Sequence, residues 1–127
     1  MAAAAQKTNR TGAGRQLRKC IATLTARRDF LARLAERHAA EGKPYVHAHR
    51  DAQLLANLLA FLAGDVDALG DPTRRAQVRT MITSRVKILD QLIDDGRRRG
   101  VVVDREGSER RAMEIALDEL ARLQVNG

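Results

Sequence analysis

The apolar positions of the chain recur at a helical period along most of its length. Between Arg15 and Glu41 they return every three to four residues, with one interruption at Arg27 and Arg28. The positions are Leu17, Cys20, Ile21, Leu24, Leu31 and Leu34. This spacing predicts a long amphipathic helix, which Gly42 and Pro44 end. A second helix is expected from about residue 48 to 63. Its leucines spread over a wide face, which predicts that it is the most buried helix of the fold.

An acidic connector, residues 64–71, separates this first pair of helices from a second pair. Its last residue, Asp71, precedes Pro72, and these two residue types favour the N-cap and the first position of a helix. A third helix is therefore expected from Pro72 to between Gly96 and Gly100. Residues 101–103 are expected to form a loop that packs on the core. A fourth helix, capped by Ser108, is expected to follow.

A shift of 58 residues places 25–63 over 83–121 without a gap, with identical residues at eight of the 39 positions. We interpret this repeat as a duplication, and convergence of two hairpins on one pattern is the alternative. The fold predicted is all-α: a four-helix up-down bundle of two pseudo-repeated antiparallel hairpins. A flexible basic arm, residues 1–14, would precede a single helical domain, residues 15–124, with hairpins at 15–63 and 72–124.

Composition and charge refine this prediction. The 127 residues are 44% hydrophobic but only 2% aromatic, which indicates an aliphatic core. The formal net charge is +7, and the excess lies on the first twenty residues and on the third helix. In an up-down bundle these two regions would meet in a predicted basic pole. The candidate nucleic-acid-binding residues of the arm and this pole are Lys7, Arg10, Arg15, Arg18, Lys19, Arg74, Arg75 and Arg79. Asp65, Asp67 and Asp71 lie at the same end and could neutralise it.

The remaining charged and reactive residues have plain structural interpretations. Arg27 and Arg85 are equivalent under the 58-residue shift, and each lies within an apolar stripe. Each is expected to extend its head group to solvent or to pair with an acid, with Asp65 and Glu119 as candidate partners. Cys20 is the only cysteine, so no internal disulfide can form. We expect it to be buried as a small hydrophobic residue in a cytoplasmic protein.

Nothing in the sequence resembles a catalytic or cofactor site. His38, His47, His49 and Asp51 are residue types that bind metals, but no fourth ligand closes a constellation around them. We interpret them as polar turn residues, with a metal-dependent enzyme or regulator as a minor alternative. No catalytic residue, metal or cofactor is predicted. No apolar run reaches the roughly 20 residues that a membrane span needs, so no membrane partner is expected.

Two functions are consistent with these features. The first is a non-catalytic helical module that binds nucleic acid through phosphates, with little base specificity. The second is a structural or adaptor protein that acts by helix–helix assembly, as a homo-oligomer or with a protein partner. The small, Ala- and Arg-rich helical chain resembles phage packaging and head-assembly components in this respect.

Overall fold

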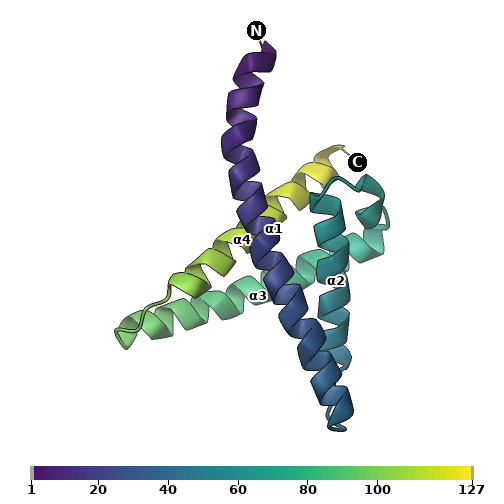
Figure 1. The fold of residues 1–127 in the computed structure, drawn as a ribbon, viewed down its shortest axis with the longest axis vertical. Coiled ribbons are helices and arrows are strands. Elements are labelled where there is room, and N and C mark those ends of the chain that lie inside the picture. The colour runs from purple at the N-terminus through teal and green to yellow at the C-terminus, as the bar shows by residue number, and fades with distance from the viewer. Residues whose placement is uncertain (1, 127) are drawn as a thin grey trace.

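The computed structural model describes the backbone of residues 2–126 and the side chains of residues 14–123. Helix α1 comprises Ala2–Ala40 and helix α2 comprises Val46–Leu62. The two run antiparallel (Figure 1). Helix α1 begins well before the predicted start at Arg15, so the backbone at Gly12 and Gly14 is helical. The predicted flexibility of residues 1–14 stays a prediction.

The acidic connector contains a short 3-10 helix, η1, Val66–Leu69. Asp65 caps it by accepting a hydrogen bond from the Asp67 amide at 3.1 Å. Leu69 is completely buried and anchors the connector to the core, which the acidic composition of the segment did not indicate. Helix α3, Pro72–Arg98, begins as predicted, since the Asp71 carboxylate accepts from the Thr73 amide at 3.1 Å.

Helix α4, Asp104–Asn126, begins four residues before the predicted cap at Ser108. The prediction was wrong because residues 101–103 double back along α3. Val103 packs against Gly96, and a Cβ added to Gly96 would lie 2.4 Å from Cγ1 of Val103. The first turn of α4 follows directly, with the Gly107 amide donating to the Val103 carbonyl at 2.9 Å. Acidic residues at Asp104 and Glu106 favour a helix start at this point.

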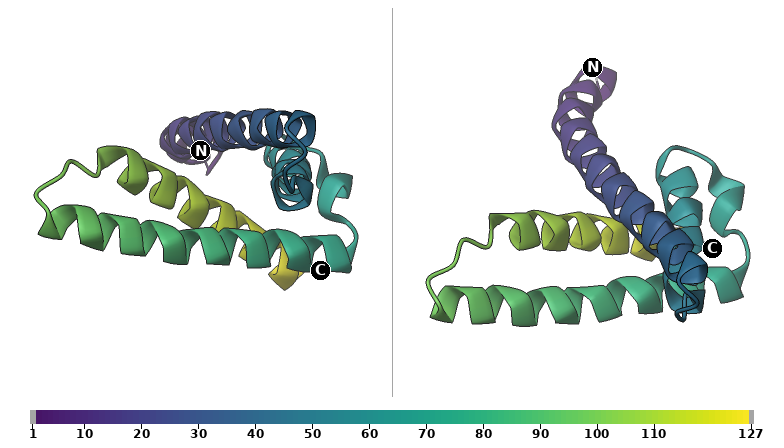
Figure 2. Two further views of the ribbon diagram at one scale, coloured as in Figure 1. Left: turned by 90° about the horizontal axis from the view of Figure 1, so that it is seen from below. Right: turned by 60° about the horizontal axis from the view of Figure 1, so that its bottom comes forward.

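Four α-helices and no strands make up the described residues, so the all-α prediction is confirmed. The predicted up-down alignment of all four helices is not confirmed, because the hairpin α1–α2 crosses the hairpin α3–α4 (Figure 1). Figure 2 shows the hairpins as two layers. Helix α1 contacts α2 and α4, and α3 contacts α4 and α2, whereas α1 and α3 are not in contact along the described backbone.

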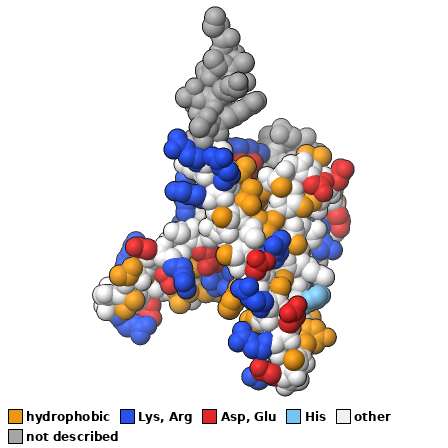
Figure 3. Space-filling model, viewed as in Figure 1, with side chains coloured by type: hydrophobic (Ala, Val, Ile, Leu, Met, Phe, Trp, Pro, Cys, Tyr) orange, Lys and Arg blue, Asp and Glu red, His pale blue; other side chains and the backbone are white. Residues whose placement is uncertain are grey.

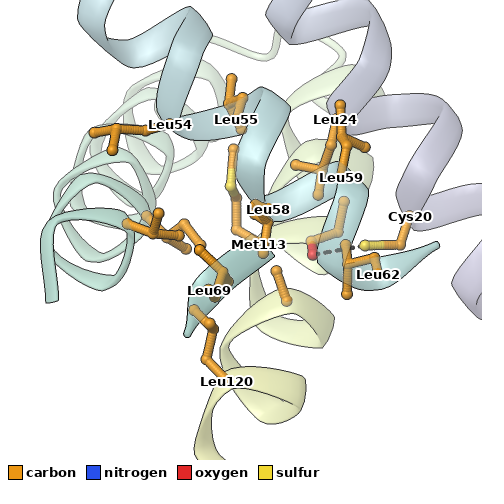
Figure 4. Packing of buried hydrophobic residues seen from close by; sticks show 14 of the residues in the cluster. Cys20, Leu24, Leu54, Leu55, Leu58, Leu59, Leu62, Leu69, Met113 and Leu120 are labelled. Carbon is orange, nitrogen blue, oxygen red and sulfur yellow. Dashed lines mark hydrogen bonds between the residues drawn. The ribbon is translucent and has the colours of Figure 1, made fainter. Parts of the chain in front are cut away.

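The core lies where the two layers cross, and it is aliphatic as predicted. Helix α2 contributes six buried residues, more than any other helix among the described side chains, which confirms it as the most buried helix. Figure 4 shows leucines of α2 packed between Leu24 of α1 and Met113 of α4. Cys20 is 1% exposed, and its thiol donates to the Ala112 carbonyl with a Sγ–O distance of 3.2 Å. The prediction of a buried Cys20 is confirmed, and its hydrogen bond links α1 to α4.

Burial and turn geometry coincide at positions 58 residues apart. Eight such pairs are buried in both hairpins: Cys20/Val78, Leu24/Ile82, Leu31/Leu89, Ala35/Ile93, Leu54/Ala112, Leu55/Met113, Leu58/Ala116 and Leu62/Leu120. Gly42 and Gly100 have φ angles of 70° and 69°. The amide of Lys43 donates to the His38 carbonyl and that of Val101 to the Gly96 carbonyl, both at 2.8 Å. Each hairpin therefore turns through the same glycine-ended helix cap.

Candidate nucleic-acid interface

The crossed hairpins divide the predicted basic pole into two separate regions. Arg15, Arg18 and Lys19 are exposed on α1, and Figure 3 shows Lys and Arg side chains gathered on this part of the helix. The start of α3 carries a half-buried group, Arg74, Arg75 and Arg79. Because α1 packs on α4 and does not contact α3, the expected meeting of these two groups does not occur.

The two groups also differ in how exposed their cationic head groups are. In the second group, one terminal nitrogen of Arg79 is buried and has no hydrogen-bond partner among the described atoms. Such a buried guanidinium is less available to an outside ligand than an exposed one. Lys7 and Arg10 belong to α1, and their side chains lie outside the part of the chain that the structure describes.

The cations that accompany the first group come from the far end of the second hairpin. Lys19, Arg97 and Arg111 line one concave region of about 850 Å³ between α1, the end of α3 and the start of α4. Asp104 is the one acidic residue that lines it. Arg15 and Arg18 do not line this region but lie beside it on α1, within one turn of Lys19. We call the three lining cations and these two neighbours together the basic groove. It exists because the α1–α4 contact folds these segments together.

Few acids neutralise the basic groove. Within residues 14–123, Arg15, Arg18, Lys19 and Arg97 form no ion pair. Arg111 contacts Glu114 at 3.3 Å, in an exposed pair that weakens the cation little. The sequence contains no acid before Asp29, so none is available on this part of α1. The cations of the groove are therefore free to contact an anionic ligand.

Sequence reasoning missed two members of this groove. Arg97 lies in the last turn of α3, where a cation stabilises the helix by itself, so its position alone does not indicate a ligand. No pattern within α3 or α4 marks Arg97 or Arg111 as special. They lie next to Lys19 only because α1 packs on α4, and the hydrophobic pattern of the sequence does not predict this packing.

A second charged cluster lies at the crossing of the hairpins. Arg85 donates to both carboxylate oxygens of Glu109, at 2.6 and 2.9 Å. The predicted partner Glu119 is wrong, because the doubling back of residues 101–103 brings Glu109 opposite Arg85. The predicted Asp65 partner of Arg27 is also wrong. The Arg27 guanidinium instead lies over the Phe30 ring, 5.4 Å from its centroid.

The electrostatic surroundings of Arg27 come from both hairpins. Burial lowers its pKa from the ordinary value, and the nearby Arg85 cation lowers it further. Glu109 and Asp51 act in the opposite direction. Asp51 itself lies 3.9 Å from Arg50, measured from carboxylate oxygen to guanidinium nitrogen. Arg27 and Arg85, 58 residues apart in sequence, are thus close enough to influence each other.

The histidines do not converge on a site. His38 lies in the last turn of α1 with Nδ1 3.2 Å from the Pro44 carbonyl oxygen, and His47 and His49 are exposed on α2. In the part of the chain that the structure describes, no three His, Cys, Asp or Glu residues are placed to hold a metal ion. None of the described helices is long and apolar enough to cross a membrane.

No protein-family model matches the sequence, and no curated protein or solved structure is significantly similar to it.

Proposed function

We propose that this protein is a non-catalytic helical module that binds nucleic acid through the basic groove. Lys7 and Arg10 would extend the contact along α1, as the sequence suggests. The observation that carries the proposal is the convergence of Lys19, Arg97 and Arg111 from three helices on one concave surface. Nearly all cations of this groove are without an acidic partner among the described side chains. Cations in such an array bind phosphates and release counterions, which drives association.

The proposed contact has little base specificity. The groove residues are arginines and a lysine with long side chains, and the chain has no tryptophan and only three other aromatic residues to stack on bases. Phosphate contacts fix position along a duplex but carry no sequence information. We therefore expect similar affinity for duplexes of unrelated sequence.

Binding of a labelled duplex, measured by fluorescence anisotropy at several salt concentrations, tests the proposal. The logarithm of affinity should fall steeply and linearly with the logarithm of salt concentration. The triple variant Arg15→Glu, Arg18→Glu, Lys19→Glu should weaken binding and reduce the slope by about 3, since each lost phosphate contact contributes about 1. A salt-independent affinity, or no binding even at low salt, would reject the proposal.

The matched control variant is Arg33→Glu, Arg37→Glu, Lys87→Glu. These three cations are exposed, are not part of the groove, and change the net charge by the same amount. If both triple variants lose affinity equally, only the overall charge matters and the groove is not the binding site. A third variant, Arg74→Glu with Arg75→Glu, tests the remaining candidates at the start of α3.

Homo-oligomer assembly is the second candidate function, and one observation favours it. Phe30, Ile88 and Leu92 are 44%, 47% and 46% exposed although they are large and apolar. Phe30 and Ile88 occupy positions 58 residues apart on the two outer helices. A second copy of the chain could cover them. Light scattering should then show a dimer or larger species that Phe30→Ser and Ile88→Ser dissociate, and a strict monomer at high concentration would exclude it.

We also propose that the two hairpins are repeats of one ancestral hairpin. The matched burial at eight position pairs and the matched Gly42 and Gly100 turns support this proposal beyond the sequence identities. The starts of α2 and α4, at Val46 and Asp104, are also 58 residues apart. Under this proposal, Arg27 and Arg85 would derive from a single arginine.

A further inference from the structure

A cavity of about 440 Å³ opens between α2 and α3, on the other side of the crossing from the basic groove. This volume is within the range of small-molecule sites. Apolar side chains from three helices line it: Leu54, Leu55, Met81, Ile82, Ile88 and Met113. Arg27, Arg50 and Arg85 add positive charge, and Asp51 is the one acid among the lining residues. The cavity therefore combines an apolar wall with an excess of cations.

Arg27 is the cation of this cavity that has no acidic partner among the described side chains. Arg85 donates to both carboxylate oxygens of Glu109, and the exposed Arg50 lies 3.9 Å from Asp51. Arg27 has only the face of the Phe30 ring. Its half-buried head group has lost water without forming an ion pair among the described side chains, which accords with its lowered pKa. An incoming anion would thus meet a cation that is already partly desolvated.

A row of uncharged polar side chains follows α3 along the same cavity. Thr73, Gln77, Thr80 and Ser84 recur every three to four residues, and all four line the cavity. Hydroxyl and amide groups donate to and accept from a ligand without demanding a charge. The apolar wall, the polar row and the unpaired cation together suit a ligand with one anionic end and one aliphatic end.

We propose that this cavity binds an amphipathic carboxylate, with the carboxylate on Arg27 and the aliphatic tail against Leu54, Leu55 and Met113. A cationic ligand does not fit, because three arginines and a single acid line the cavity. A nucleobase does not fit either, since no aromatic ring lines the cavity. The inference is independent of nucleic-acid binding, because none of the basic groove residues lines this cavity.

The methionines provide reporters for the test. Met81 and Met113 line the cavity, and Met1, the third methionine of the chain, does not contribute to its described lining. In protein labelled with ¹³C at the methionine methyl groups, titration with decanoate should shift the Met81 and Met113 signals in a saturable way. The Met1 signal should not follow. Absence of saturable shifts at Met81 and Met113 would overturn the proposal.

Two comparisons separate a specific site from adsorption of an aliphatic chain. Arg27→Gln should weaken decanoate binding about tenfold or more, because it removes a charge-assisted hydrogen bond. Arg33→Gln, an exposed arginine on the same helix, should leave it unchanged. Decanol should bind more weakly than decanoate to the unmodified protein. Equal binding of decanol and decanoate, or equal loss in the two variants, would show that Arg27 does not hold the carboxylate.

Discussion

The hairpin α1–α2 and the hairpin α3–α4 bury residues at corresponding positions, but their charged side chains form different contacts. Under a shift of 58 residues, the core positions of one hairpin fall on core positions of the other. Their charges do not follow this correspondence. Arg85 donates two hydrogen bonds to Glu109. The equivalent pair in the first hairpin is Arg27 and Asp51, and no ion pair forms there, because the aspartate side chain is one methylene shorter than glutamate and Asp51 contacts Arg50 instead. The comparison teaches that the two hairpins share their pattern of burial and their turn geometry, while their charged side chains pair differently.

The turns show how side-chain size modifies the same backbone. In the second hairpin Gly96 lies within contact of Val103, and the connecting segment packs closely on α3. In the first hairpin the equivalent positions hold His38 and Tyr45, of which Tyr45 is 45% exposed. Both segments nonetheless make the same amide-to-carbonyl hydrogen bond at 2.8 Å. The backbone hydrogen bonds are thus preserved while the packing around them differs.

The largest expected effect on stability is that of shortening a buried side chain of α2, because α2 has a larger residue than α4 at the equivalent position. Leu58 of α2 and its equivalent Ala116 of α4 are both fully buried. Leu58→Ala should lower the free energy of unfolding by about 3 kcal/mol, because it removes buried methyl groups and leaves a cavity. Urea denaturation measures this loss. The control Leu92→Ala, at a 46% exposed site, should cost less than about 1 kcal/mol. Comparable losses at the two sites would contradict the assigned core.

The second expected effect is a pH dependence of stability caused by Cys20, which its equivalent Val78 cannot produce. Burial raises the pKa of the Cys20 thiol from 9.0 to about 11, and the charge of Glu119 contributes. Because the folded protein keeps the proton that the unfolded chain loses, stability is fully present below pH 9 and falls between pH 9 and 11. The loss should be on the order of 2 kcal/mol. Cys20→Val, which introduces the residue found at the equivalent position 78, should abolish this loss of stability at high pH.

This pH dependence is measured by urea denaturation under reducing conditions at several pH values. Because other groups of the protein also change charge in alkaline solution, the informative quantity is the difference in stability between the unmodified protein and Cys20→Val. Parallel curves for the two proteins would mean that the thiol is not protected from ionisation in the folded state.

The ion pairs provide the third contrast between the hairpins. Glu109→Gln leaves the Arg85 guanidinium without its anion at a site where the two side chains are only 21% and 14% exposed. We expect a cost of about 1.5 kcal/mol, as for a lost hydrogen bond to a charged group. The equivalent Asp51→Asn should cost less than about 0.5 kcal/mol, because Asp51 pairs only with the exposed Arg50 at 3.9 Å. Equal costs in thermal denaturation would show that a stabilising ion pair is not specific to the second hairpin.

Much of this fold is predictable from the sequence, and the limits have physical causes. Helical periodicity located four helices, and Asp71 with Pro72 marked the start of α3 within one residue. The direction in which the hairpins cross was not predictable, because it depends on how the buried side chains of the two layers pack together in one cluster. The basic groove depends on that crossing, so sequence reasoning named Lys19 but joined it to Arg74 instead of Arg97 and Arg111.

The smallest expected effect tests whether the two turns are equivalent. Gly42 and Gly100 have positive φ angles of 70° and 69°, which side chains with a Cβ rarely adopt. Gly42→Ala and Gly100→Ala should therefore each lower stability by about 1 kcal/mol, and by the same amount within error. Nothing lies within 4 Å of the added Cβ at either site, so the cost is one of backbone strain alone.

Gly107→Ala is the control for these turn variants. Gly107 lies within α4, and an added Cβ there also meets no atom within 4 Å. Because alanine favours a helix over glycine, this variant should raise stability by about 0.5 to 1 kcal/mol. Thermal denaturation of all three variants decides the point. A loss at Gly100 without a loss at Gly42 would mean that the matched φ angles do not carry matched strain, and the proposal of one ancestral hairpin would lose its support from the turns.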